Sequence, residues 1–355
     1  MQISRRDLIA CAAAGVLTPA FVAKASPRTE KPFPDLAAEL GVCAVSYCRL
    51  SAGKPLVPEV LSGCGPNQTV DRKALFQAAS LTKPVTAFVA LTLTEQGRLD
   101  LDAPVSDYLP EGYAHLQRPF TDPYDPRFDL VTANVLKSVP VRTLLNHSSG
   151  LPNWTHRNLV PAFPAGTHWQ YSGEGYALLQ AVISAVMAQD FEKSVAEHVF
   201  TPLGMHSSRL QFAEDIAERL VSGTSRSGKH KQLVFRRANG AASLYTTAED
   251  YAKFTQAVLS RPAITALTLD NPIEVVPKLG LSWGQGWGVE NAEGGPYLWH
   301  WGNNPGFRAF VMVSVVSGDG FVILTNSERG MPLAASLARA VIPADHGAFR
   351  FSLVN

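Results

Sequence analysis

Charged side chains are scarce in this 355-residue sequence, and neither sign dominates. Lys and Arg number 31 against 30 Asp and Glu, so charged residues make up 17% of the chain and the formal net charge is +1. A nucleic-acid-binding surface needs an excess of basic residues, and a disordered chain combines high charge with low hydrophobicity. Because 46% of the residues are apolar, the composition instead predicts a globular protein with a large core.

Cysteine is rare as well. The four cysteines are Cys11, Cys43, Cys48 and Cys64, and no two of them have the C-x-x-C spacing of a zinc or thioredoxin-like site. Two strand-like segments, 41–50 and 55–63, flank a turn and predict a hairpin that places Cys43 nearly opposite Cys64. The pattern therefore allows one disulfide, Cys43–Cys64. The alternative is that the three cysteines after the N-terminal segment are buried small hydrophobic side chains.

A long apolar run occurs only near the N-terminus. It extends from Leu8 to Ala23, follows Arg5-Arg6, and precedes the small-x-small sequence Ala23-Lys24-Ala25. This layout predicts a twin-arginine export signal over residues 1–25. A membrane anchor is the weaker alternative, because ~16 apolar residues fall short of the ~20 that span a bilayer. Cys11 lies inside the run rather than after it, which argues against a lipid anchor, so we expect an exported, periplasmic or secreted protein.

Beyond residue 25, helical and strand patterns alternate without an internal repeat. Apolar spacing predicts helices over Ser80–Gly97, Tyr176–Phe200, Thr247–Leu259 and Pro332–Val341. Strands are expected at Gly286–Glu290, Ala309–Ser317 and Gly320–Thr325, and the segment 98–139, broken by prolines, should hold loops and short helices. Strands towards both ends, with helices and loops between them, predict a sheet interrupted by a helical insertion.

Two common hydrolase signatures are missing from the chain. It contains no G-x-S-x-G of a nucleophile elbow and no H-E-x-x-H of a zinc enzyme. What it does contain is Ser80-Leu81-Thr82-Lys83 at the start of a predicted helix, where residues i and i+3 share a face. The lysine amine can then act on the serine proton, and the helix N-terminus favours a developing oxyanion. A second S-x-x-K, Ser51 to Lys54, lies in a turn and has no such context.

Two further motifs carry candidate groups. Tyr171, in Tyr171-Ser172-Gly173, becomes a useful base only beside a cation such as Lys83 that stabilises its phenolate; the alternative is an interface tyrosine. His300, in His300-Trp301-Gly302, follows an expected strand and could meet a substrate at its edge. The alternative is a histidine whose hydrogen bonds are satisfied within the fold.

Together, the three motifs resemble those of the serine hydrolase family that contains class C β-lactamases, D-alanyl-D-alanine carboxypeptidases, D-aminopeptidases and related esterases. Flanking segments are also similar to family patterns: Leu144–Pro152 to "LLxHxSGLP", Thr201–Met205 to "PLGM", and 239–250 to a Gly-rich "ST-x-x-D" stretch. The resemblance extends from about Leu36 to Val341.

The resemblance implies a role for each motif. Ser80 would be the acylated nucleophile, and Lys83 and Tyr171 the acid/base pair. His300 would be the counterpart of the family's Lys or His before x-Gly, and Gly302 would be the glycine of that motif. The backbone N–H groups of Ser80 and Asn303 would form the oxyanion hole.

The same resemblance implies an α/β (α+β) fold of the β-lactamase/transpeptidase type, with an antiparallel sheet flanked by helices. The sheet domain would comprise residues 26–79 and 240–355, and a mostly helical domain, 80–239, would be inserted between them. The site would lie between the two domains.

One departure affects the expected substrate. Lactamases have Tyr-x-Asn where this chain has Gly173, so the side-chain amide that hydrogen-bonds a substrate amide is missing. We therefore expect a metal-free, cofactor-free serine hydrolase that favours a small ester over an amide or peptide. The alternatives are a D-alanyl-D-alanine carboxypeptidase or β-lactamase, and a non-catalytic cell-wall binding protein. The sequence leaves the oligomeric state open.

Overall fold

The computed structural model describes residues 31–52, 54, 56–63, 70–121, 125 and 127–354. The predicted export signal, residues 1–25, lies outside them and stays a prediction, as does the proposed pairing of Cys43 with Cys64. Cys43 is disulfide-bonded, but Cys64 is outside the described residues. Cys48 is a buried free thiol.

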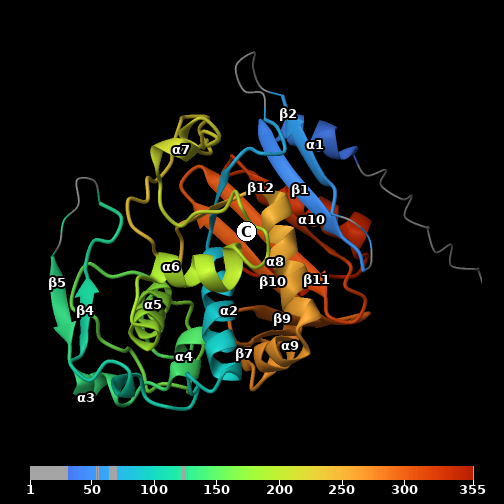
Figure 1. Ribbon diagram of the computed structural model, residues 1–355. Helices are drawn as coiled ribbons and strands as arrows, with labels where there is room; N and C mark the ends of the chain where they lie inside the picture. Colours follow the sequence, from blue (N-terminus) through green and yellow to red (C-terminus); the bar gives the residue numbers. More distant parts are fainter. Residues whose placement is uncertain are drawn as a thin grey trace, which may run out of the picture. The chain divides into compact units, whose positions relative to one another are not determined.

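An eight-stranded antiparallel sheet is built from both ends of the chain (Figure 1). Its strand order is β2-β1-β12-β11-β10-β9-β8-β7. The strands are β1 (Ala44–Leu50), β2 (Pro58–Ser62), β7 (Ile273–Val276), β8 (Leu281–Trp283), β9 (Gly288–Ala292), β10 (Gly295–Asn304), β11 (Phe307–Ser314) and β12 (Gly320–Thr325). Two small sheets pair β3 (Phe76–Ala79) with β6 (Leu244–Thr246), and β4 (Tyr113–Leu116) with β5 (Phe128–Val131).

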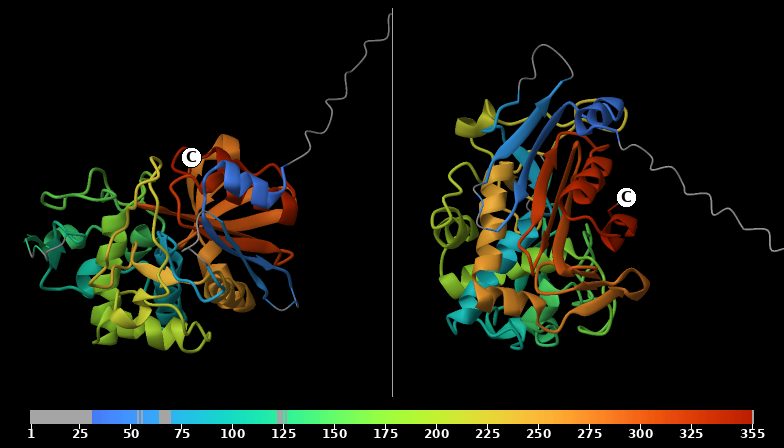
Figure 2. Two further views of the ribbon diagram at one scale, coloured as in Figure 1. Left: turned by 90° about the horizontal axis from the view of Figure 1, so that it is seen from above. Right: turned by 90° about the vertical axis from the view of Figure 1, so that its right-hand side faces the viewer.

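Helices cover both faces of the large sheet (Figure 2). The α-helices are α1 (Phe33–Glu39), α2 (Thr82–Glu95), α3 (Ala133–Leu136), α4 (Val141–Leu145), α5 (Gly173–Met187), α6 (Phe191–Val195), α7 (Glu214–Ala217), α8 (Ala248–Ser260), α9 (Pro262–Leu269) and α10 (Met331–Val341). Short 3-10 turns lie at 105–107, 277–279 and 347–350, and a π turn at 196–200. Helix α8 packs on β1 and β12 from one side, and α10 packs on β11 and β12 from the other.

The central strands are apolar on both faces, because each face packs against helices. On β12, Val322 and Leu324 join the core towards α2 and α8, while Phe321 and Ile323 join the core towards α10. All six residues of β12 are buried. A strand whose successive side chains point into two cores has no polar face, so its sequence is a continuous apolar run. Among the described residues, no helix combines the length and apolar character needed to cross a bilayer.

The structure confirms the expected hairpin of β1 and β2, and helices close to the predicted positions of α2, α8 and α10. It corrects the predicted helix Tyr176–Phe200. Helix α5 ends at Met187, because Ala188 adopts the left-handed conformation with φ 53°, and α6 begins afresh at Phe191. Apolar spacing continues across the break, which is why the pattern predicted one helix.

His300 differs from its expected position as well, since it lies within β10 rather than after a strand. Segment 98–139 contains loops and short helices as expected, together with the unpredicted hairpin of β4 and β5.

Candidate active site

Ser80 lies in the turn between β3 and α2, where the backbone is strained. Ala79, immediately before it, has φ 52°, and the pairing of β3 with β6 shifts register between Gln77 and Ala79. A left-handed alanine costs about 1–2 kcal/mol, and strain of this kind concentrates at functional sites. The turn brings the half-buried Ser80 to the N-terminal end of a 14-residue helix.

Lys83 is one helical turn after Ser80 and is buried. Its Nζ lies 3.2 Å from Ser80 Oγ and donates a hydrogen bond to the Ala241 carbonyl at 2.9 Å. No carboxylate among the described residues forms an ion pair with it. Burial therefore lowers the pKa of Lys83 well below its ordinary value. An uncharged amine keeps a lone pair, which can accept the Ser80 proton.

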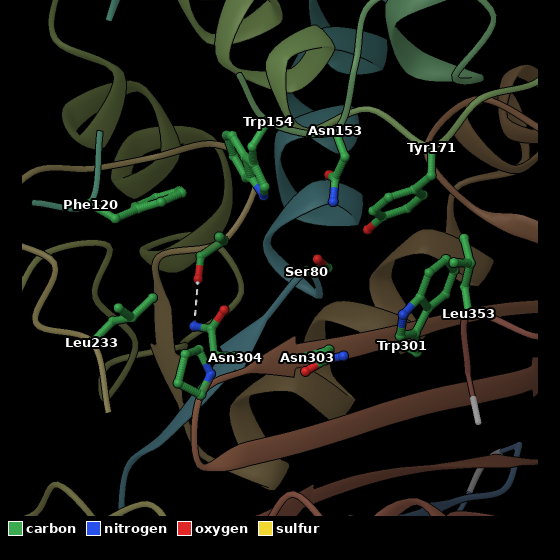
Figure 3. Close-up of a pocket in the computed structure, with 12 residues that line it drawn as sticks. Ser80, Phe120, Asn153, Trp154, Tyr171, Leu233, Trp301, Asn303, Asn304 and Leu353 are labelled. Atoms are coloured by element: carbon green, nitrogen blue, oxygen red, sulfur yellow. Dashed lines mark hydrogen bonds between the residues drawn. The ribbon is translucent and has the colours of Figure 1, made fainter. Parts of the chain in front are cut away.

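Tyr171 lies next to both Lys83 and Ser80. The Lys83 Nζ lies 4.7 Å from the centre of the Tyr171 ring, and the Tyr171 hydroxyl points towards Ser80 (Figure 3). Burial raises the pKa of Tyr171, and its interaction with Ser80 opposes this only in part. Among the described residues the hydroxyl has no hydrogen-bond partner of ordinary geometry. Tyr171 therefore holds its proton, and the phenolate expected from the sequence is not favoured in the free protein.

His147 holds the backbone next to Tyr171. The Ser172 N–H donates to His147 Nδ1 at 3.1 Å, and the imidazole lies 4.4 Å from the Tyr171 ring between centres. Ser172 in turn caps α5, since its Oγ accepts from the Gly175 N–H at 2.8 Å. Sequence reasoning quoted His147 only as part of a flanking motif and did not assign it this positioning contact.

His300 is fully buried beside Lys83 and Tyr171. Its Nδ1 lies 2.8 Å from the Trp301 carbonyl oxygen, to which it donates, and its ring centre is 6.2 Å from that of Tyr171. Burial is the main cause that lowers the pKa of His300, to about 3. The imidazole is thus neutral at pH 7. His300 is not among the residues that line the pocket, and its substrate-binding role stays a prediction.

Gly302 lets β3 approach β10 closely. A Cβ at Gly302 would lie 2.3 Å from the Ala78 carbonyl oxygen, so no larger residue fits there. The close approach brings Asn303 to the same pocket as Ser80. Asn304 fixes this junction, because its Nδ2 donates to Gln77 Oε1 at 3.1 Å. The same nitrogen donates to the Ala242 carbonyl at 3.3 Å (Figure 3).

Ser80, Tyr171, Asn303 and Asn304 open onto a pocket of about 250 Å³, and the described part of its lining carries no cationic side chain and no carboxylate. The lining residues are Ser80, Phe120, Asn153, Trp154, Tyr171, Leu233, Ala242, Trp301, Asn303, Asn304, Pro305 and Leu353. Phe120, Trp154 and Leu233 lie on one side of Ser80, and Tyr171, Trp301 and Leu353 lie on the other (Figure 3). Among the described residues, no three His, Cys, Asp or Glu side chains are grouped so that they could hold a metal ion.

Sequence reasoning did not identify most of the residues that line this pocket. Asn153 directly follows the flanking motif that ends at Pro152, which was its one signal in the sequence. Phe120, Leu233 and Leu353 come from distant segments without a motif.

The family model described as Beta-lactamase matches residues 52–346. Penicillin-binding protein 4 from Amycolatopsis lactamdurans is 24% identical over 318 residues, covering 78% of this chain and 79% of its own. Esterase EstB from Burkholderia gladioli is 32% identical over 170 residues, 39% of each chain. The structure of a class C beta-lactamase overlaps with a TM-score of 0.71 at 20% identity, covering 86% of this chain and 93% of that one. This overlap confirms the predicted α/β fold of the β-lactamase/transpeptidase type.

Proposed function

Because the chain belongs to the beta-lactamase family and is a serine hydrolase, we propose that it hydrolyses small neutral esters through an acyl-enzyme on Ser80. The observation that carries this proposal is the pocket, whose lining among the described residues includes no Asp, Glu, Lys, Arg or His side chain. A charged substrate would lose hydration on entering such a pocket without gaining an ionic partner, whereas a neutral ester loses little.

Acylation begins with the Ser80 proton. Uncharged Lys83 accepts it across the 3.2 Å contact, and Ser80 Oγ attacks the ester carbonyl carbon. The resulting oxyanion is stabilised by the N–H groups of Ser80 and Asn303. When the carbonyl re-forms, the leaving alkoxide takes a proton from Tyr171, and the Lys83 ammonium returns one to Tyr171, so the alcohol departs neutral.

Deacylation repeats these steps with water in place of the alcohol. Water attacks the acyl carbonyl as its proton passes through Tyr171 to Lys83, and Ser80 recovers a proton from Lys83 as the acid leaves. The products are one carboxylic acid and one alcohol.

The position of the proton donor orients the substrate. Since Tyr171 protonates the leaving oxygen, the alcohol lies on the side of Tyr171, Trp301 and Leu353. The acyl group then lies against Phe120, Trp154 and Leu233, where the Phe120 and Trp154 ring centres are 4.7 Å apart in an edge-to-face arrangement.

A D-alanyl-D-alanine carboxypeptidase or β-lactamase is the second candidate, and the named relative Penicillin-binding protein 4 favours it. Its substrates carry a carboxylate, for which the described lining of the pocket offers no cation, and His300 is neutral. A non-catalytic cell-wall binding protein is the third candidate. It would not need Lys83 held uncharged against the serine. Export across a membrane, predicted from residues 1–25, remains part of the proposal for where this ester hydrolase acts.

The test compares kcat/KM for p-nitrophenyl butyrate with kcat/KM for nitrocefin, which carries a carboxylate. We expect the ester to be preferred. Ser80→Ala should abolish turnover with an unchanged unfolding temperature, because a half-buried hydroxyl contributes little to stability. A wild-type preference for nitrocefin would favour the second candidate, and wild-type activity in Ser80→Ala would remove Ser80 from the mechanism.

A further inference from the structure

The space next to Tyr171 that a side chain at position 173 would fill is already occupied. A Cβ at Gly173 would lie 2.4 Å from Trp154 Cζ2, 2.6 Å from Trp154 Cε2 and 2.5 Å from the Asn153 carbonyl oxygen. Real Cβ atoms do not approach other heavy atoms this closely, so position 173 must be glycine while Asn153 and Trp154 stay in place. The lack of a side chain at position 173 is therefore a consequence of the placement of Asn153 and Trp154.

Asn153 is fixed at this position by its own hydrogen bonds. Its backbone carbonyl accepts from the N–H groups of Gly173 and Glu174, at 3.0 and 3.1 Å. Its Oδ1 also accepts from the Gly173 N–H at 3.0 Å. Because Oδ1 must face an N–H donor, the orientation of the amide is determined, and Nδ2 faces the other way. Figure 3 shows this nitrogen directed into the pocket between Trp154 and Tyr171.

We propose that Asn153 Nδ2 is a specificity-determining donor that binds a carbonyl or ether oxygen on the acyl group of the substrate. The inference rests on the proposed ester hydrolysis and adds the class of acyl group. Esters of N-acylamino or alkoxy acids should be better substrates than esters of plain alkanoic acids. The donor would thereby replace the side-chain amide that Gly173 cannot supply.

Other amides near Ser80 are less suited to this role. Asn304 Nδ2 already donates to Gln77 and to the Ala242 carbonyl. Asn303 lies on the opposite wall, with the oxyanion amides (Figure 3). Asn153 instead adjoins Trp154 on the acyl side, and a neutral donor suits a pocket whose lining is uncharged.

The experiment compares two esters of equal chain length, p-nitrophenyl N-acetylglycinate and p-nitrophenyl pentanoate. The readout is the ratio of their kcat/KM values, each divided by the rate of alkaline hydrolysis to correct for intrinsic reactivity. A hydrogen bond between neutral groups corresponds to about two- to tenfold in affinity, so the wild-type ratio should exceed one by this factor.

Two variants separate substrate binding from support of the loop. Asn153→Asp keeps an oxygen for the Gly173 N–H but loses the donor, and Asn153→Ala loses both. The matched control is Asn291→Asp, at an exposed position of β9. Both Asn153 variants should lose the preference for N-acetylglycinate, and the control should keep it.

A preference retained in Asn153→Asp would overturn the proposal, since it would mean that Asn153 only holds Gly173. A wild-type ratio of one would overturn it as well. Failure of the wild type to hydrolyse either ester is a different result, because it would also overturn the proposed function.

Discussion

Lys83 and His115 are both basic side chains withdrawn from solvent, but their neighbours differ. Lys83 lies among Ser80, the Ala241 carbonyl and aromatic rings. His115, on β4, lies between two carboxylates, with Nδ1 at 2.7 Å from Asp129 Oδ1 and Nε2 at 3.2 Å from Glu174 Oε2. Both basic side chains are almost completely buried.

The surroundings shift the pKa values of the two side chains in opposite directions. Burial alone lowers the pKa of Lys83. Burial also lowers the pKa of His115, but its contacts with Glu174 and Asp129 raise the pKa by more, so that the net change is upward. Carboxylates near the buried base therefore decide whether it is a proton acceptor or one partner of an ion pair.

The two carboxylates around His115 also hold in place the loop that follows Trp154, on the proposed acyl side of the pocket. Asp129 Oδ2 accepts from the Leu159 N–H at 3.0 Å, and Glu174 Oε1 accepts from the Thr155 N–H at 3.0 Å. These bonds hold both ends of the loop that follows Trp154. Glu174 also belongs to the first turn of α5, directly after Tyr171-Ser172-Gly173.

The largest expected effect comes from removing the functional groups of Lys83 and Tyr171. Lys83→Ala and Tyr171→Phe should each lower kcat/KM for a p-nitrophenyl ester by ~10² to 10⁴. The double variant should lose little more than the worse single variant, because the two groups move one proton in sequence. Steady-state kinetics on folded variants measures this, and multiplicative losses would assign the two residues to separate steps.

Removing one carboxylate from His115 should instead affect stability. Glu174→Gln keeps an acceptor for the Thr155 N–H but breaks a buried ion pair, which should lower the free energy of unfolding by about 3 kcal/mol. Lys83→Met, which removes a buried amine without an ionic partner, should raise it. Denaturant unfolding of both variants checks the contrast, and a destabilised Lys83→Met would contradict it.

His300→Lys tests whether a cation near the pocket would change the substrate. A hydrogen bond to a charged group is worth ~1.5–3 kcal/mol, roughly ten- to a hundredfold in affinity. We expect the kcat/KM ratio to shift towards nitrocefin by up to that factor, and His300→Gln, the neutral control, to leave the ratio near wild type. Equal ratios in all three proteins would show that position 300 does not set this choice.

The smallest expected effect is in the pH dependence of stability. Protonated His115, whose pKa is raised, stabilises the fold fully below the ordinary value of about 6.5, and this contribution is lost as the pH rises through the raised pKa. His147 and His300 have lowered pKa values, so stability falls as the pH drops below about 6.5, and the His300 contribution extends to about pH 3.

Each histidine changes the free energy of unfolding by at most about 1.4 kcal/mol per pH unit. Unfolding measured from pH 4 to 9 should lose part of its alkaline slope in His115→Gln, since the raised pKa of His346 also contributes to that slope, and part of its acid slope in His300→Gln. An acid slope unchanged in His300→Gln would mean that His300 is protonated in the folded protein.

The sequence predicted the contact between Ser80 and Lys83, where side-chain chemistry and local geometry coincide. Ser80 and Lys83 are one helical turn apart, so their 3.2 Å contact follows from helix geometry. Tyr171 and His300 lie on other segments, and only the family resemblance connected them to the serine. The antiparallel sheet with helices on both sides was predicted from the same resemblance.

The remaining features depend on packing between segments without a local pattern. Nothing near Phe120 or Leu353 in sequence indicates that they face each other across Ser80. His115, Asp129 and Glu174 come from three different elements, so their contact is a property of the tertiary fold. The break at Ala188 is likewise a backbone conformation that apolar periodicity does not encode.

The most direct test of this account is the pH dependence of Ser80 acylation by a neutral fluorophosphonate, followed by intact mass and peptide mapping. The reagent does not titrate, so the profile reports the enzyme's own base. Because burial lowers the pKa of Lys83, the rate should reach its plateau well below the ordinary lysine pKa, with the label on Ser80. A rate that keeps rising towards the ordinary lysine pKa of about 10.4, or a label on another residue, would contradict the account.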